Sequence, residues 1–184
     1  MKKVKKEIRT IGIDDSPFKF SDKKTKIVGC VFRGRDRIVD VVSSNITVDG
    51  FDSTDKICEL VKNSRHIEQI RVLMLDGITF GGLNVVDLDE IHERMGKPVI
   101  AVNRKKPSIK DICRAADNTD EGKKRKELIK KAGKVNNVHL KKGEIYYQSR
   151  GLKKEVIKDI LENTTYSGLL PEPLRVAHLI AKNI

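Results

Sequence analysis

The chain has 184 residues, of which 38% are apolar and 35% charged, and its 38 Lys and Arg against 26 Asp and Glu give a net charge of +12. This length suits one domain with a substantial core, and no apolar run approaches the roughly 20 residues of a membrane span. Three scattered cysteines without a Cys-x-x-Cys pair, and four histidines without ligand spacing, argue against a disulfide framework and a zinc knuckle. We therefore expect one cytoplasmic domain over residues 1–184, with no membrane partner.

The first third of the chain predicts strands. Arg9 to Ile13 is a short β-rich segment that ends in Asp14-Asp15, and residues 16–26 form a polar loop. Two further β-rich runs, 26–32 and 38–48, flank a turn at Gly34, which is typical of a hairpin. The first three strands are therefore expected to form an antiparallel meander.

The middle of the chain alternates between helices and strands. A helix is expected from the capping residues 52–55 to about residue 64, and another over 85–95, where Gly96 ends it. Continuous apolar runs at 70–75 and 98–102 predict buried strands. The first of these strands stops at Asp76-Gly77.

The last third is expected to be mainly helical. Helices are predicted from Ser108, over 152–161 and over 173–180, with a possible strand at 143–148. Residues 118–134 are so charged that they predict a solvated helix or a loop. The element order indicates an α/β domain with a mixed five-stranded sheet, an antiparallel meander followed by parallel strands, as in the ribonuclease H-like fold.

Basic residues gather in short clusters, which predicts nucleic acid, DNA or RNA, as the partner. A merely solubilising surface, or the charge-rich composition of a heat-adapted protein, is the alternative. The clusters are Lys2 to Lys6, Lys23 to Lys26, Arg33 to Arg37, Arg104 to Lys106 and Lys123 to Lys126.

Two acidic positions, Asp14-Asp15 and Asp76, each follow a predicted strand, where an open α/β sheet places its site. If the first and fourth strands are neighbours, Asp14 and Asp76 lie side by side and repel each other unless a cation intervenes. Mg²⁺ or Mn²⁺ suits carboxylate oxygens and would activate water against a phosphodiester. The alternative is that Asp15 and Asp76 are turn or cap residues.

Two loops could complete this edge. Gly77, Gly81 and Gly82 lie between a strand and a helix, where backbone amides can bind an anion, although a structural turn explains them equally well. The segment 49–55 could supply a third acid or only a turn and a helix cap. The candidates for the third acid are Asp15, Asp52, Asp55 and Asp87.

Three segments resemble those of endonuclease V, in that family's order and at close to its spacing. They are Ile11-Gly-Ile-Asp-Asp-Ser, Leu73-Met-Leu-Asp-Gly with Pro98-Val-Ile-Ala-Val, and Leu170-Pro-Glu-Pro-Leu-Arg. The segments Asp76-Gly-Ile-Thr-Phe-Gly-Gly-Leu-Asn-Val-Val-Asp and Pro171-Glu-Pro-Leu-Arg-Val-Ala-His more closely resemble an archaeal family of uncharacterised proteins, domain-of-unknown-function family ninety-nine. The first resemblance implies a ribonuclease H-like fold and Mg²⁺-dependent cleavage of strands with deaminated bases such as inosine. It assigns Asp14 and Asp76 as metal ligands.

Other motifs of endonuclease V are altered in this chain. Lys56, beside Asp55, stands at the position of the catalytic glutamate, and Thr47 is near that of the strand-wedging tyrosine. Arg104 keeps the charge of a lysine, Gly81-Gly82 replace a His-Pro-Arg loop, and Ser149-Arg150-Gly151 replaces a late Gly-His-Arg. These changes predict a substrate different from that of endonuclease V.

The sequence thus predicts a nucleic-acid phosphodiesterase that depends on a divalent metal. Its metal ligands would be Asp14 and Asp76, with Asp15, Asp55 or another acid as the third, and Arg104 would join the two aspartates as a catalytic residue. Arg104 and Lys105, with Gly81 and Gly82, would hold phosphates. A catalytically silent nucleic-acid-binding module of the same fold is the main alternative, and a small-molecule phosphate enzyme that uses the 77–82 loop is another.

Overall fold

The computed structural model describes residues 4–19 and 21–184, so Lys2 and Lys3 of the first basic cluster lie outside the described residues. The main sheet has seven strands in the order β3-β2-β1-β4-β7-β9-β8, and β5 pairs with β6 in a separate ribbon. The strands are β1 (Arg9–Asp15), β2 (Lys24–Arg33), β3 (Arg37–Thr47), β4 (Val72–Asp76), β5 (Thr79–Phe80), β6 (Asn84–Val85), β7 (Val99–Asn103), β8 (Asn136–Leu140) and β9 (Gly143–Arg150). The helices are α1 (Ser53–Lys62), α2 (Leu88–Met95), α3 (Ile109–Asp117), α4 (Gly122–Lys131), α5 (Lys154–Thr164) and α6 (Glu172–Ala181).

The expected meander is confirmed, because β1 pairs antiparallel with β2 and β2 antiparallel with β3. The centre of the sheet is parallel: β4 lies between β1 and β7, and all three strands run in the same direction. Buried apolar runs such as Val72–Leu75 form these central strands because both faces of the sheet are covered. The sheet contains the five expected strands, the strand considered at 143–148, which is β9, and one unexpected strand, β8, at its edge.

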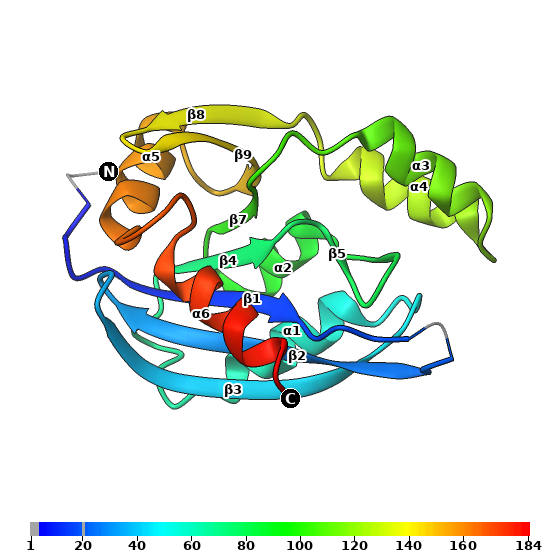
Figure 1. Cartoon of the computed structure of the whole chain (residues 1–184), viewed down its shortest axis with the longest axis horizontal. Helices are drawn as coiled ribbons and strands as arrows, with labels where there is room; N and C mark the ends of the chain where they lie inside the picture. The colour runs from blue at the N-terminus through cyan, green and yellow to red at the C-terminus, as the bar shows by residue number, and fades with distance from the viewer. Residues whose placement is uncertain (1–3, 20) are drawn as a thin grey trace.

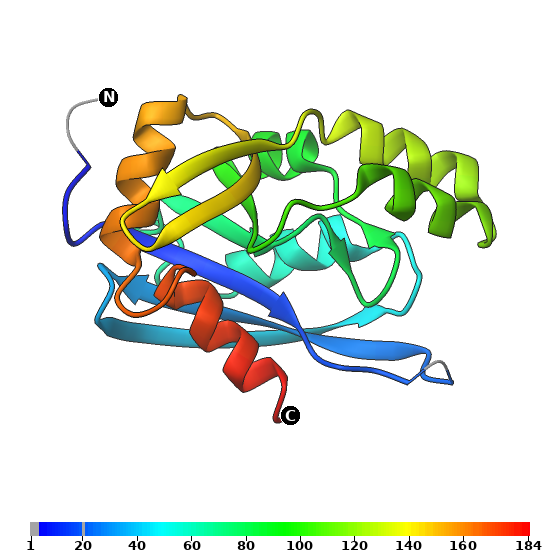
Figure 2. The ribbon, with the colours of Figure 1, turned by 45° about the horizontal axis from the view of Figure 1, so that its top comes forward.

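Helices cover both faces of the sheet (Figures 1 and 2). On one face, Ile11 and Ile13 of β1 pack in a core with Ile57 of α1 and Ile91 of α2. On the other face, α5 packs over β4 and β7, and α6 packs over β1 and β2. Because successive side chains of a strand alternate between faces, the neighbours of Ile11 and Ile13 in β1, Gly12 and Asp14, point toward α6.

One expected element boundary is corrected, and one open alternative is decided. The helix predicted over 85–95 begins only at Leu88, because Asn84–Val85 form β6 and the side chain of Asp87 caps the helix by accepting from the amides of Asp89 and Glu90. The charged segment 118–134, expected to be a solvated helix or a loop, contains the helix α4. Its buried residues Arg125 and Ile129 explain why a segment this polar is ordered against the domain.

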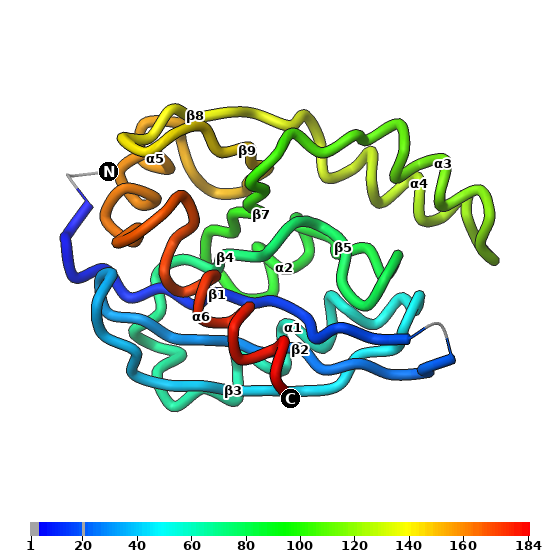
Figure 3. The backbone as a smooth tube through the Cα atoms, in the orientation of Figure 1, coloured from blue at the N-terminus to red at the C-terminus, as the bar shows by residue number. Residues whose placement is uncertain are grey.

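The helical hairpin α3–α4 is the most protruding part of the molecule (Figures 1 and 3). In both ribbon views it extends beyond the arrowheads of β1 and β4, so it lies on the side of the sheet where the carboxyl ends of these strands meet. Among the residues described, the helices are all too short or too polar to cross a membrane.

Candidate metal centre at the carboxyl ends of the central strands

The close approach of α6 to β1 builds the candidate site. A Cβ atom added at Gly12 would lie 2.2 Å from the carbonyl carbon of Pro173 and 2.4 Å from the amide nitrogen of Leu174. Only glycine therefore leaves room for the first turn of α6 against the middle of β1. This contact joins the segments Ile-Gly-Ile-Asp-Asp and Leu-Pro-Glu-Pro, which are 160 residues apart in the chain, to within van der Waals distance.

Three side chains meet where β1, β4 and α6 come together. The last parallel pair between the two strands is Ile13 with Leu75, so Asp14 and Asp76 are the next residues on adjacent strands. Ligand atoms of Asp14, Asp76 and His178 all lie within 4.8 Å of one another. The expectation that the first and fourth strands are neighbours is confirmed, and it brings the two aspartates together.

The neighbours of the acids at this edge offset the cost of burying them only in part. Asp14 is 4% exposed, and its pKa rises to about 6, first because burial disfavours the charged carboxylate and second because Asp76 is close. Burial also raises the pKa of Asp76, and the positive charge of Arg104 opposes that rise only in part. Such a pair of carboxylates is stabilised when a cation binds between them.

His178 on α6 is the partner that sequence analysis missed. Its Nδ1 lies 2.7 Å from Oδ2 of Asp14, and its side chain is 46% exposed. The sequence carried one signal: the motif Pro171-Glu-Pro-Leu-Arg-Val-Ala-His ends on this residue. Nothing in the local pattern indicated that α6 would lie across β1 and direct His178 toward Asp14.

Asp15 points to the opposite face of β1 and contacts the glycine loop. Its Oδ2 accepts a hydrogen bond of 2.8 Å from the amide of Gly81, while burial raises the pKa of this carboxyl. Asp49 accepts in the same way from the amide of Leu83, at 2.7 Å. At least two amides of this loop thus bind carboxylates of the protein itself, and Gly82 lies so close to Asp49 that a Cβ atom there would sit 2.4 Å from Oδ1.

The other acids considered as a third ligand have partners elsewhere. Asp52 accepts from Thr47 and Asn84, Asp55 accepts from Arg94 at 2.6 Å, and Asp87 caps α2 and pairs with Lys131 at 2.5 Å. Among the described residues, the one cluster of three or more potential metal ligands is Asp14, Asp76 and His178. The structure therefore brings Asp14 and Asp76 together as potential metal ligands, whereas Asp52, Asp55 and Asp87 form hydrogen bonds and ion pairs that stabilise loops and helices.

The basic residues expected to hold phosphates follow β7. Arg104 and Lys105 are exposed, directly after the strand that pairs with β4, and the register places Val102 beside Asp76. The positive charge of Arg104 lowers the pKa of Asp76, against the larger effect of burial. The basic segment that starts at Arg104 therefore lies close to Asp14 and Asp76.

The model of the Endonuclease dU family matches residues 6–184. The chain belongs to this family. Among its relatives, the UPF0215 protein of Methanosarcina barkeri is 46% identical over 181 residues, which cover 98% of this chain and 92% of that protein. The UPF0215 protein of Methanopyrus kandleri is 40% identical over 186 residues, which cover all of this chain and 94% of that protein.

Solved structures show the same fold as this Endonuclease dU chain. A protein of unknown function from Archaeoglobus fulgidus superposes with a TM-score of 0.85 at 34% identity, covering 94% of this chain and 95% of that one. Human ENDOV gives a TM-score of 0.63 at 16% identity, covering 94% of this chain and 82% of that one. Ciona intestinalis endonuclease V, solved with a 24mer DNA that contains an inosine followed by a ribo-adenosine, gives 0.58 at 15% identity, covering 92% and 82%. The chain therefore has the α/β fold of endonuclease V, in agreement with the resemblance of its motifs.

Proposed function

We propose that this protein is a divalent-metal-dependent endonuclease with a ribonuclease H-like arrangement, and that it cleaves DNA strands containing deoxyuridine. The observation that carries the proposal is the cluster of two carboxylates and one imidazole, within 4.8 Å of one another, at the ends of adjacent parallel strands. The substrate class is supported by the description of the family, Endonuclease dU. Deoxyuridine, like inosine, is a deaminated nucleoside, so the reaction would resemble that of endonuclease V on a different base.

The donor set fits a hard divalent cation. Carboxylate oxygens are the preferred ligands of Mg²⁺ and Mn²⁺, and two opposite ligands of such an ion lie roughly 4 Å apart at bond lengths of about 2 Å. The separations at Asp14, Asp76 and His178 approach that span. When bound, the metal polarises a phosphodiester and lowers the pKa of a water molecule.

The side chains of the chain have distinct parts in this proposal. Asp14 and Asp76 would hold the cation, and Arg104 and Lys105 would donate hydrogen bonds to phosphate oxygens next to it. Two roles fit His178: its imidazole binds the cation directly, or its Nδ1 donates to Asp14 and fixes the orientation of that carboxylate. Asp15 would act through Gly81, by holding the glycine loop beside the site.

The test is a cleavage assay on end-labelled DNA strands that differ at one nucleotide: deoxyuridine, deoxyinosine or thymidine. We expect cleavage only with Mg²⁺ or Mn²⁺, faster for deoxyuridine than for inosine, and none for thymidine. Asp14→Asn and Asp76→Asn should each abolish it, whereas Asp55→Asn, on a carboxylate that pairs with Arg94, should not. DNA binding without cleavage of any strand would overturn the proposal in favour of a catalytically silent nucleic-acid-binding module.

A further inference from the structure

The segment 104–134, which contains the hairpin α3–α4, carries much of the positive charge of the molecule. Residues 104–134 contain twelve Lys and Arg against five Asp and Glu, in a chain whose net charge is +12. Many of these cations are exposed and, within the described chain, have no carboxylate within 4.0 Å. They are Arg104, Lys105, Lys106, Lys110, Lys123 and Lys130.

The basic residues of α4 divide into two groups with different roles. Lys124, Lys126 and Lys131 form ion pairs with Glu121, Asp117 and Asp87. Lys123 and Lys130 are seven residues apart, so they lie on one face of the helix, turned away from the buried side of α4. The exposed side chain of Glu127 lies on the same face, four residues after Lys123 and three before Lys130, so positive charge exceeds negative charge there by one. This face is the part of α4 whose net positive charge can meet an external anion.

Helix α4 is fastened to the domain at two places, one near its amino end and one at its carboxyl end. The guanidinium of Arg125 is 3% exposed and donates to the carbonyl oxygens of Asp49, Gly50 and Leu83. Leu83 is in the loop whose Gly81 binds Asp15, so this contact links α4 to the neighbourhood of Asp14.

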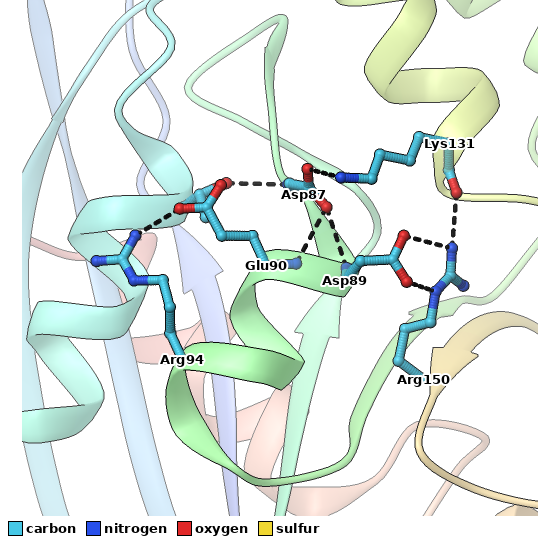
Figure 4. A network of polar contacts seen from close by, with 7 residues as sticks. Asp87, Asp89, Glu90, Arg94, Lys131 and Arg150 are labelled. Atoms are coloured by element: carbon cyan, nitrogen blue, oxygen red, sulfur yellow. Dashed lines mark hydrogen bonds and ion pairs between the residues drawn. The ribbon is translucent and has the colours of Figure 1, made fainter.

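The second fastening lies at the carboxyl end of α4 (Figure 4). Arg150 donates to the carboxylate of Asp89 and to the carbonyl oxygen of Lys131, at 2.6 Å for the latter, while the ammonium of Lys131 pairs with Asp87. These two sets of contacts, near the amino end and at the carboxyl end of α4, hold the hairpin against the domain, although its tip extends away from the sheet.

We propose that the α3–α4 hairpin is a DNA-binding arm that holds the phosphate backbone on one side of the cleaved bond. This inference rests on the proposed function, because the arm extends from Arg104, near Asp76, in the direction of the strand carboxyl ends. The nine residues of α3 span about 14 Å, a length that covers about four nucleotides of a duplex strand at about 3.4 Å each. The partner fits because exposed cations outnumber exposed acids along residues 104–134 and begin next to the site at Arg104.

The experiment measures binding of deoxyuridine-containing duplex DNA in chelator, as a function of salt, so that no cleavage occurs. The double variant Lys123→Ala/Lys130→Ala should bind roughly tenfold or more weakly at low salt and lower the slope of log affinity against log salt by nearly two units. The matched control is Lys154→Ala/Lys158→Ala, which removes the same charge from exposed positions of α5, at the other end of the molecule. The control should leave the slope unchanged.

A second measurement locates the contact on the DNA. Duplexes are shortened by four base pairs on either side of the deoxyuridine. Shortening on one side should weaken binding of the wild type but have little further effect on the arm variant, since the contact is already lost. Equal losses in the arm and control variants, or no loss in the arm variant, would overturn the proposal. Tighter binding of duplex RNA than of DNA would also overturn it as stated.

These outcomes are separate from failure of the proposed function. A wild-type protein that binds DNA through the arm yet cleaves nothing with Mg²⁺ or Mn²⁺ would overturn the endonuclease and retain the arm. Equal melting temperatures for the wild type and both double variants exclude unfolding as the cause of any loss.

Discussion

Two groups of acids in this molecule differ in what surrounds them. The first group lies at the start of α2, where each acid forms an ion pair (Figure 4). The pairs are Asp87 with Lys131, Asp89 with Arg150, and Glu90 with Arg94. The pKa of Asp89 is lowered, first by its hydrogen bond with Arg150. At the ends of β1 and β4, Asp14 and Asp76 are buried and their pKa values are raised.

A cluster of acids therefore does not by itself mark a functional site. The α2 group is balanced by fixed cations and by the amides of a helix N-terminus, so it stabilises the fold. The β1–β4 group keeps an electrostatic cost that its neighbours offset only in part, which is common where function requires it. In the proposed function, a bound divalent cation would remove that cost.

The largest expected effect is on catalysis. Asp76→Asn should reduce metal-dependent cleavage of deoxyuridine-containing DNA by about a thousandfold or more, because loss of the metal removes several kcal/mol of transition-state stabilisation. Asp89→Asn, which removes an equal charge from the paired group, should leave the rate within a few-fold. Comparable losses in the two variants would show that the contrast between the groups has no catalytic meaning.

The next effect concerns stabilisation by metal. Mn²⁺ at one hundred times its dissociation constant should raise the free energy of unfolding of the wild type by about 2.7 kcal/mol, since it binds only the folded state. Asp14→Asn and Asp76→Asn should lose this response, and Asp89→Asn should keep it. Thermal melts in chelator and in Mn²⁺ measure all four proteins, and identical wild-type curves under both conditions would count against a metal site.

In chelator, the two groups should respond to neutralisation with opposite signs. Asp89→Asn should destabilise the protein by about 1 kcal/mol, because Arg150 loses a charge-assisted partner that is partly screened by solvent. Asp76→Asn should leave stability unchanged or raise it slightly, because it relieves repulsion at Asp14. Denaturant unfolding measures both variants, and a clear loss for Asp76→Asn would indicate that its carboxylate is a satisfied structural partner.

The pH dependence of stability should also differ in sign. The folded state holds the proton of Asp14 up to about pH 6, whereas the unfolded state releases it near pH 4. Between these values the folded state binds more protons, so this carboxyl makes the metal-free protein less stable as pH rises. Asp89 has a lowered pKa, so its contribution is lost as pH falls. Unfolding measured from pH 4 to 7 in chelator should show the first trend more weakly in Asp14→Asn than in the wild type, since the raised pKa values of Asp15 and Asp76 remain.

The smallest effect on stability is expected at the surface beside the site. Arg104→Ala and Lys105→Ala should change the free energy of unfolding by no more than about 0.5 kcal/mol. Each should nevertheless lower the salt slope of DNA binding by about one unit, as expected when one phosphate contact is lost. An unchanged slope would place the DNA backbone on another face, away from Asp14 and Asp76.

The meander, the buried parallel strands and the aspartates at their ends could be predicted from the sequence, because they depend on short apolar runs and on the residues that follow them. Strand-forming apolar runs define β1, β4 and β7, and each run ends at a polar or charged residue: Asp14, Asp76 and Asn103. The edge strand β8 was missed because Asn136 to Leu140 is polar and largely exposed, with Val138 its one buried residue. A strand of this kind is specified by its pairing with β9 rather than by its own composition.

The tertiary structure was needed to show which acids lie close together and that His178 lies beside them. The sequence does not distinguish Asp14 from Asp15, since both follow the same apolar run. Successive side chains of β1 point to opposite faces, so Asp14 contacts His178 of α6 and Asp15 contacts the amide of Gly81. His178 enters the site because Gly12 admits α6 against β1, a contact between residues 160 positions apart. A single sequence does not show such long-range contacts, since they depend on how whole elements pack and not on the propensities of the residues that make them.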